Sequence, residues 1–334
     1  MQMDNIIIAA AKRTPMGNLL GSLSSLAAHQ LSAIANQAVI EQANIQAEDI
    51  DEVMLGCVLP AGQGQAPARQ AAINANIPHH IGATTINKMC GSGMKTVMLA
   101  HDTILAGSAD IILAGGMESM SNAPYLLNKA RQGYRLGHGE LYDHMFIDGL
   151  EDAYQSGKPM GYFAENTAKA YQFSREQQDE FAQASLTRAI EANSNGGFKD
   201  EIIPVTVKTR KQEITINHDE GADPAKLTKN TKLKPAFVKD GTVTAANSSS
   251  ISDGACSLIM IRERVAQQKG ITPLAKIIAH SAHAQAPEWF TTAPISAIKN
   301  VLQKAAWKIE DVDLFEINEA FAVVTMAAMH DLAI

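Results

Sequence analysis

Asn87-Lys88-Met89-Cys90-Gly91-Ser92-Gly93-Met94 is the stretch around which this chain is organised. A β-prone run, Ala83-Thr84-Thr85-Ile86, leads into it, and apolar residues spaced three and four apart follow it, which predicts a strand, a corner and a helix. Cys90 therefore lies at a corner whose glycines allow close backbone approach. Unpaired N–H groups and the positive end of a helix dipole stabilise a thiolate there. Taken alone, the stretch is compatible with a reactive thiol or with a small buried hydrophobic side chain.

Length and composition describe a chain of 334 residues with 46% hydrophobic and 19% charged residues, typical of a globular enzyme with two or more subdomains. A net charge of −7 without a basic run argues against nucleic-acid binding. Three scattered cysteines argue against a disulfide framework or a metal site and favour a reducing compartment. Neither a signal-like stretch nor a membrane-spanning stretch occurs, so a cytoplasmic location without a membrane partner is expected.

The expected elements follow the order of a layered α/β core. Buried strands are expected at 5–11, 53–58 and 110–114, the last closed by Gly115-Gly116, and helices at 32–43, 68–75 and 174–193. The last helix starts with a capping box, Ser174-Arg175-Glu176-Gln177. The predicted division is a core half at 1–120, a large insertion at 121–245 and a second core half at 246–334, with an exposed excursion around 131–139.

A short internal repeat links the two core halves. Ala33-Ile34-Ala35-Asn36 matches Ala297-Ile298-Lys299-Asn300, and Glu48-Asp49-Ile50-Asp51 matches Glu310-Asp311-Val312-Asp313. The match predicts two copies of one α/β unit, with a strand at 314–316 as the partner of 53–55. Residues 328–334 have the pattern of an apolar helix without a cap. We therefore expect the second half to be incomplete.

Five motifs, in their order and spacing, resemble those of the thiolase family along nearly the whole chain. They are Asn87–Met94, Ala114–Ser121, Met160-Gly161 with Ala164-Glu165-Asn166, Ala245–Ser249 with Asp253-Gly254-Ala255, and Asn318–Ala322. The likeness is greatest to the biosynthetic type, the acetyl-CoA acetyltransferases. It implies a layered αβαβα core of two similar halves and a loop-domain insertion for CoA binding and oligomerisation. The implied reaction is the reversible condensation of two acetyl-CoA to acetoacetyl-CoA and CoA, with no cofactor besides these CoA substrates and no metal.

The resemblance also implies roles for individual residues. Cys90 matches the nucleophile that forms an acyl-enzyme, with its own N–H contributing to an oxyanion hole. Asn318 matches the residue that holds a water in a second oxyanion hole. The positions that line the pantetheine tunnel are Leu150, Met160, Ser249, Ala320 and Phe321. The nucleotide end of CoA is expected near Lys208, Arg210 and Lys211, although a solvated charged strand edge explains those residues equally well.

Two departures from the family pattern stand out. Pro159 replaces a histidine that many biosynthetic thiolases carry, which leaves the preferred acyl-chain length open. The printed sequence contains neither the Gly-His-Pro motif whose histidine activates the nucleophile nor the late cysteine motif, its last cysteine being Cys256. A chain truncated at its C-terminus and impaired in turnover is therefore expected. Surface or structural roles are expected for His138, His144, His218, His280 and His283. His79-His80 is expected in a loop without companion ligands at metal spacing, and Glu118 and Asp253 are expected to serve turns and buried polar networks.

Two alternatives to the acetyltransferase remain open. One is a non-catalytic thiolase-fold protein that binds CoA, and the other is a degradative 3-ketoacyl-CoA thiolase with longer substrates. The family resemblance implies a homodimer or homotetramer, and the excursion from Arg131 to His144 resembles the loop that joins dimers into tetramers.

Overall fold

The computed structural model describes residues 4–208 and 212–334, and the chain forms two compact units. The first consists of Met1–Gly149, Phe198–Gly221 and Ile251–Ile277. The second consists of Leu150–Gly197, Ala222–Ser250 and Ile278–Ile334. These units differ from the three consecutive segments predicted above, because strand β10 (Ser252–Arg262), which follows the insertion, pairs with strands near the N-terminus.

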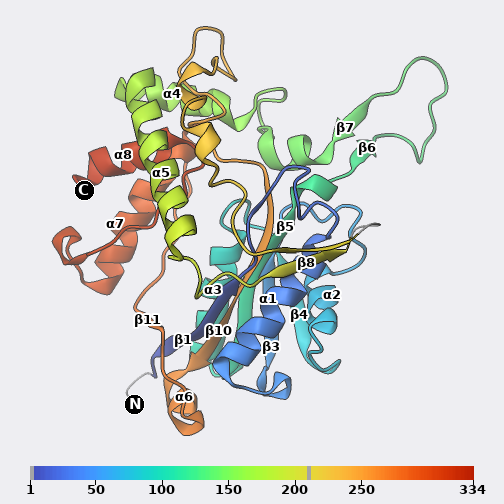
Figure 1. Ribbon diagram of the computed structural model, residues 1–334, viewed down its shortest axis with the longest axis vertical. Helices are drawn as coiled ribbons and strands as arrows, with labels where there is room; N and C mark the ends of the chain where they lie inside the picture. Colours follow the sequence, from blue (N-terminus) through green and yellow to red (C-terminus); the bar gives the residue numbers. More distant parts are fainter. Residues whose placement is uncertain (1–3, 209–211) are drawn as a thin grey trace. The chain divides into compact units, whose positions relative to one another are not determined.

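A seven-stranded sheet forms the centre of the first unit, in the order β11-β1-β10-β5-β3-β4, with the short β2 beside β10 (Figure 1). Its other strands are β1 (Ile6–Arg13), β2 (Gly17–Asn18), β3 (Glu52–Gly56), β4 (Gly82–Ile86), β5 (Ile111–Ser119) and β11 (Ala275–Ile277). β3 runs parallel to β4 and β5, whereas β10 runs antiparallel to β1 and β5. The three predicted buried strands are confirmed as β1, β3 and β5.

Helices cover both faces of this sheet. They are α1 (Ala28–Ala43), α2 (Pro67–Asn74), α3 (Ser92–Leu105) and α6 (Glu263–Lys269), with short turns η1 (Ala47–Asp49), η2 (Met120–Asn122) and η3 (Phe146–Leu150). Successive strand residues point to opposite faces. Leu113 accordingly packs in the cluster that contains residues of α1 and α2, and its neighbour Ile112 packs in the cluster that contains residues of α3. The predicted α/β layering is confirmed for this unit.

The expectation that Gly115-Gly116 ends the strand at 110–114 is wrong. β5 continues through both glycines to Ser119, and β10 pairs with it along this stretch. A Cβ at Gly115 would collide with the carbonyl oxygen of Cys256 on β10. The glycine therefore serves close strand pairing rather than a turn.

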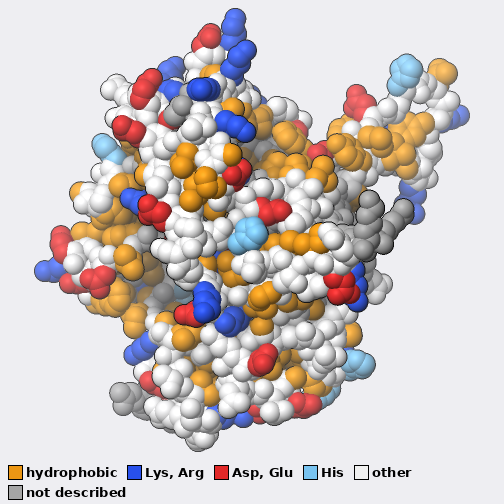
Figure 2. All heavy atoms as spheres, in the orientation of Figure 1, with side chains coloured by type: hydrophobic (Ala, Val, Ile, Leu, Met, Phe, Trp, Pro, Cys, Tyr) orange, Lys and Arg blue, Asp and Glu red, His pale blue; other side chains and the backbone are white. Residues whose placement is uncertain are grey.

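Two hairpins complete the first unit. β6 (Tyr125–Leu127) pairs with β7 (Leu141–Asp143), and β8 (Val205–Lys208) pairs with β9 (Glu213–Ile216). The connection between β6 and β7 projects outward, and Figure 2 shows hydrophobic side chains along it. Leu136 in this connection is fully exposed. The predicted exposed excursion is thus confirmed.

The second unit is helical in its regular elements. They are α4 (Met160–Tyr171), α5 (Arg175–Asn195), α7 (Ala293–Ala305) and α8 (Ala322–Leu332), with the short turns η4 (Pro224–Lys226), η5 (Asn230–Lys232), η6 (Pro287–Thr292) and η7 (Ile309–Asp311). The capping box of α5 is confirmed, since Ser174 Oγ accepts from Gln177 N–H and Ser174 N–H donates to the Gln177 side chain.

The internal repeat is visible in local geometry. Asn44 after α1 and Ala306 after α7 both cap their helices in the left-handed conformation, with φ of 53° and 56°. The next turn also recurs, because Asp49 accepts from Gln46 N–H at 2.9 Å and Asp311 accepts from Lys308 N–H at 2.8 Å. The strand expected at 314–316 does not form in the described structure.

The expectation of an uncapped final helix is also wrong. α8 ends at Leu332, and Ala333 caps it in the left-handed conformation with its N–H donating to the Met329 carbonyl. Ile334 N–H also donates to the Met329 carbonyl, at 3.2 Å, so two backbone hydrogen bonds close the last helical turn.

Candidate active site

Cys90 lies at the corner between β4 and α3, as predicted, four residues after Ile86 ends the strand. Its side chain is exposed, so the interpretation as a small buried hydrophobic residue is wrong. Gly91 is the N-cap of α3, which places the thiol beside the first turn of a 14-residue helix. That end of a helix carries partial positive charge on its unpaired N–H groups.

The start of α3 is fixed closely to the sheet. A Cβ at Gly56 on β3 would lie 2.6 Å from the backbone carbon of Ser92, a separation that only glycine permits. The buried hydroxyl of Thr96 lies 2.7 Å from the Gly93 carbonyl and 3.0 Å from the Gly115 carbonyl, and it accepts from Gly115 N–H at 3.1 Å. These contacts join the first turn of the helix to β3 and β5.

Side chains from both ends of the corner hold the backbone around Met89. Asn87 Oδ1 accepts from Met89 N–H at 2.9 Å, and Asn87 Nδ2 donates to the Val58 carbonyl at 3.3 Å. Ser92 Oγ accepts from Lys88 N–H at 2.8 Å and donates to the Met89 carbonyl at 2.6 Å. Met89 has a φ of 48°. That left-handed conformation costs a non-glycine residue about 1 kcal/mol, which these hydrogen bonds offset.

Glu118 on β5 is half-buried and belongs to a polar network, the role predicted for it. Its carboxylate accepts from Val58 N–H at 2.8 Å and from Leu59 N–H at 3.1 Å, with the Cys57 sulfur 3.6 Å away. Burial raises the pKa of Glu118 above its usual value, while the two backbone hydrogen bonds act in the opposite direction. Burial, reinforced by the Glu118 charge, raises the pKa of the Cys57 thiol to about 12, so this second cysteine is held neutral.

In the second unit, four of the predicted pantetheine-lining residues come together. Ser249 N–H donates to the Ala320 carbonyl at 2.9 Å. Met160, Ala320 and Phe321 share one hydrophobic cluster, in which the Phe321 ring packs edge-on against Phe237 with centroids 5.9 Å apart. The motifs around residues 160, 249 and 320 are far apart in the sequence, and the fold of this unit joins them.

Asn247 and Glu165 support this cluster and were not assigned a role from the sequence. Asn247, which is 3% exposed, donates to Asp179 at 3.1 Å, and its carbonyl accepts from Ala322 N–H at the start of α8. The Glu165 carboxylate accepts from Thr242 N–H at 2.8 Å. Both residues lie within the quoted motifs, but their hydrogen-bond partners become evident only in the folded chain.

Asn318 lies in the irregular segment before α8, and its side chain is exposed. It belongs to the second unit, whereas Cys90 belongs to the first. The shared catalytic role assigned to them stays a prediction.

The remaining predicted contacts are placed as follows. Leu150 is half-buried at the end of η3, and Pro159 is the N-cap of α4 with φ −71°. Lys208 forms an exposed ion pair with Glu213 at 3.1 Å, which accords with a solvated charged strand edge. Arg210 and Lys211 lie outside the described residues. The role of Leu150 and of the basic residues in CoA binding stays a prediction.

His144 is a structural histidine, as expected. It is 3% exposed, its Nδ1 lies 2.6 Å from Asp148, and its Nε2 accepts from Ala61 N–H at 3.3 Å. Both ring nitrogens of this buried side chain are therefore engaged in contacts within the first unit. His79, His80, His138 and His218 are exposed on the surface.

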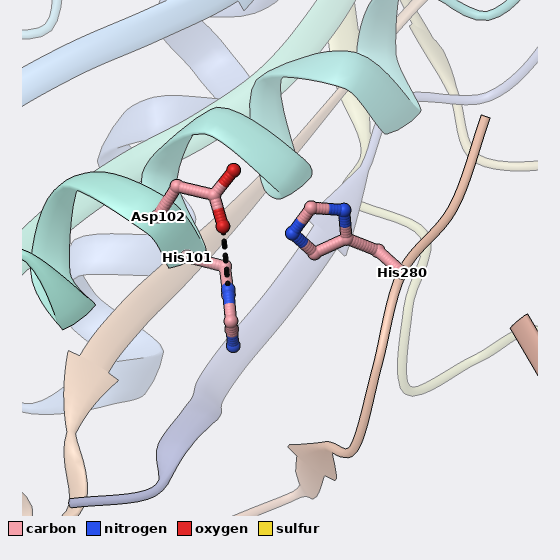
Figure 3. A group of neighbouring side chains, drawn as sticks. All are labelled: His101, Asp102 and His280. Atoms are coloured by element: carbon pink, nitrogen blue, oxygen red, sulfur yellow. Dashed lines mark hydrogen bonds and ion pairs between the residues drawn. The ribbon is translucent and has the colours of Figure 1, made fainter. Parts of the chain in front are cut away.

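A further histidine pairs with a carboxylate on α3, where His101 Nδ1 lies 3.1 Å from Asp102 Oδ1 (Figure 3). The third side chain drawn in Figure 3, His280, belongs to the second unit. Two ligands from one unit do not define a metal centre. The absence of a metal stays a prediction. Across residues 4–208 and 212–334, none of the helices combines the length and the apolar character that a membrane crossing requires.

The first unit thus defines a class: a layered α/β protein that presents an exposed cysteine at the start of a helix. Two family models match the chain, "Thiolase, N-terminal domain" over residues 6–264 and "Thiolase, C-terminal domain" over residues 271–334. The chain belongs to the thiolase family.

Named relatives and solved structures agree with this assignment. The chain is 45% identical to an "Acetyl-CoA acetyltransferase" of Rhizobium meliloti and 42% identical to a "Probable acetyl-CoA acyltransferase" of Staphylococcus aureus, each match covering 99% of this chain and 84% of the relative. The crystal structure of the Bacillus anthracis acetyl-CoA acetyltransferase matches with a TM-score of 0.96 at 38% identity, over 99% of this chain and 84% of that one. With both domain models matched, these comparisons lend no support to an incomplete second half or to impaired turnover, which stay predictions.

Proposed function

We propose that this protein is an acetyl-CoA C-acetyltransferase, which condenses two acetyl-CoA to acetoacetyl-CoA and CoA and catalyses the reverse thiolysis. The observation that carries the proposal is the exposed Cys90 thiol at the start of α3, in a chain of the thiolase family. Relatives named as acetyl-CoA acetyltransferases at 45% identity support the choice of acyl group.

The first half-reaction uses the thiolate of Cys90. Its sulfur attacks the thioester carbon of acetyl-CoA, the carbon–sulfur bond to CoA breaks, and CoA leaves as a thiolate, which gives acetyl-Cys90. The helix dipole of α3 stabilises the attacking anion, and the fixed corner holds it in place.

The second half-reaction forms the carbon–carbon bond. A second acetyl-CoA loses a proton from its methyl group, and this proton passes through solvent to the CoA thiolate released in the first half-reaction. The resulting carbanion attacks the carbonyl of acetyl-Cys90, which expels the Cys90 thiolate and yields acetoacetyl-CoA. Asn318, whose exposed amide precedes α8, is assigned to the oxygen of this enolate through a bound water.

CoA is assigned to the wall formed by Met160, Ser249, Ala320 and Phe321, with Leu150 as a further lining residue. The shared cluster and the Ser249–Ala320 hydrogen bond support this assignment, because a pantetheine arm suits an apolar wall with few polar groups. Arg210 is assigned to the nucleotide end on the family resemblance. A homodimer or homotetramer and a cytoplasmic location also remain predictions.

Intact-mass analysis tests the function. The protein is incubated with acetyl-CoA, with Cys90→Ala as the control, and CoA is then added. We expect the mass of one acetyl group on the wild type only, and its return to CoA. Failure to acetylate Cys90 would falsify the proposal and favour the non-catalytic CoA-binding alternative.

Acyl preference and turnover are tested separately. Faster acylation by medium-chain 3-ketoacyl-CoA in the presence of CoA would favour the degradative thiolase, which the proline at 159 leaves open. Acetylation without accumulation of acetoacetyl-CoA would match the expectation of impaired turnover, made from the absence of a Gly-His-Pro motif in the printed sequence.

A further inference from the structure

A chain of hydrogen bonds joins the half-buried carboxylate of Glu118 to the corner that carries Cys90. Glu118 Oε2 accepts from Val58 N–H at 2.8 Å. The carbonyl of the same residue, Val58, accepts from Asn87 Nδ2 at 3.3 Å. Asn87 Oδ1 in turn accepts from Met89 N–H at 2.9 Å, one residue before the cysteine.

Glu118 fixes the end of β3 in two places. Its second oxygen accepts from Leu59 N–H at 3.1 Å, so one carboxylate binds two successive peptide groups. Ionised carboxylates form such hydrogen bonds more strongly than neutral acceptors do. Cys57 N–H donates to the Ile86 carbonyl at 3.0 Å, which extends the pairing of β3 and β4 up to the corner. Hydrogen bonds to Glu118 and to Ile86 therefore hold the segment 57–59, which Asn87 contacts at Val58, in place.

The Asn87 side chain connects the segment 57–59 to the corner that carries Cys90. Among the described contacts, it is the only side chain that forms hydrogen bonds both with the segment 57–59, at Val58, and with the peptide of Met89. Met89 adopts a φ of 48°, a conformation that an isolated non-glycine residue rarely keeps. Releasing Asn87 would free this peptide to return to ordinary backbone conformations and would turn the next residue, Cys90.

We propose that Asn87 and Glu118 are positioning residues that hold the Cys90 sulfur in the direction of attack, with Glu118 acting through Val58 and Asn87. This inference rests on the proposed function, in which Cys90 is the acyl acceptor. Neither residue touches the reacting atoms. Acyl transfer from a thioester requires a correctly oriented Cys90 sulfur, whereas alkylation by a small reagent requires only an accessible one. Comparing the rates of the two reactions therefore distinguishes a change in the orientation of the sulfur from a change in its exposure.

A double-mutant cycle on single-turnover acetylation of Cys90 tests the proposal. The rate at saturating acetyl-CoA is measured for the wild type, Asn87→Ala, Glu118→Gln and the double variant by peptide mass after acid quench. In Glu118→Gln the side-chain NH2 group faces one of the two backbone N–H groups, from Val58 or Leu59. Two donors then oppose each other, and one of the two hydrogen bonds is lost. Each single variant is expected to lose about tenfold in rate, and the double variant about the same tenfold, because both act on one geometry.

Further readouts distinguish positioning from a general structural role. The acetyl-CoA concentration at half-maximal rate and the alkylation of Cys90 by iodoacetamide are expected to change less than about twofold. Matched controls in the first unit are Asn74→Ala, which removes a side chain bonded to His29, and Glu52→Gln, which alters a contact with Thr84. Both controls should acetylate at the wild-type rate.

Three results overturn the inference. They are wild-type acetylation in Asn87→Ala, a double variant whose loss is the product of the single losses, and an equal fall in acetylation and alkylation. Should Glu118→Gln unfold, as thermal denaturation would reveal, Asn87→Ala carries the test alone, since this residue is exposed at a corner. A wild type that does not acetylate Cys90 refutes the proposed function itself, and is seen before any variant is compared.

Discussion

Gly56 on β3 faces the backbone of Ser92 so closely that an added Cβ would lie 2.6 Å from the Ser92 carbonyl carbon and 2.7 Å from the nitrogen of Gly93. Real Cβ atoms do not approach backbone atoms to such distances, so a side chain at this position would push the start of α3 off the sheet. The helix that carries the candidate nucleophile is thus placed by the absence of a single methyl group on a neighbouring strand.

Gly56→Ala is expected to destabilise the protein by about 1–3 kcal/mol, the usual cost of overpacking a core contact. It is also expected to slow acetylation of Cys90, because the corner moves with the helix. Urea denaturation gives the stability and peptide mass the acetylation. Gly82→Ala on β4 is the matched control, since a Cβ there meets nothing within 4 Å. Equal stability of the two variants would contradict the steric argument.

Thr96→Val is expected to cost about 1–3 kcal/mol through the loss of buried hydrogen bonds, although the side chain keeps its shape. The Thr96 hydroxyl bonds to the carbonyl of Gly93 and to both the carbonyl and the N–H of Gly115, and valine satisfies none of these groups. Chemical denaturation measures the loss. Thr103→Val, at a half-buried position on the same helix, should change the free energy of unfolding by less than about 0.5 kcal/mol.

The thiols of Cys57 and Cys90 are expected to differ sharply in reactivity. In a Cys256→Ser background at about pH 8, iodoacetamide should label Cys90 and leave Cys57 unmodified. Cys57 is 1% exposed, and burial next to Glu118 raises its pKa to about 12. Peptide mass mapping over time measures both sites. Labelling of Cys57 at a comparable rate in the folded protein would show that its burial is wrongly described.

Glu118 is expected to make stability depend on pH in a defined direction. Burial raises its pKa in the folded state above the ordinary 4.5, so the folded protein binds more protons than the unfolded chain between that value and the raised one. The contribution of Glu118 is therefore fully present below pH 4.5 and is lost as pH rises through the raised pKa. The difference in unfolding free energy between the wild type and Glu118→Gln, measured by urea denaturation over a pH series, should fall with rising pH. A difference that grows with pH would mean that the hydrogen bonds from Val58 and Leu59 outweigh burial.

Asn318→Ala is expected to leave stability unchanged and to slow carbon–carbon bond formation about 100-fold, the usual effect of losing an oxyanion donor. The side chain is exposed in an irregular segment, so its removal leaves no cavity. Acetylation of Cys90 should proceed at the wild-type rate, because the assigned role belongs to the second half-reaction. Comparing acetylation with acetoacetyl-CoA formation separates the two steps, and an equal fall in both would reject that assignment.

The sequence by itself determined several local elements in both units. Apolar runs located β1, β3 and β5, the box at Ser174 located the start of α5, and the motif from Asn87 located the corner of Cys90. The internal repeat foretold a shared helix-and-turn geometry after Asn44 and Ala306. These features depend on contacts between residues close in the chain, whose pattern is readable from spacing.

Only the tertiary structure decided what lies beside these elements. The continuation of β5 through Gly115 required β10, some 140 residues later, as its partner. The contact of Glu118 with Val58 and the joining of Ser249 to Ala320 likewise connect distant segments. The position of a side chain in the local sequence pattern indicates its secondary-structure element and the face it lies on. Its contact partners, however, are set by strand order and helix packing, because these bring together residues that are far apart in the sequence.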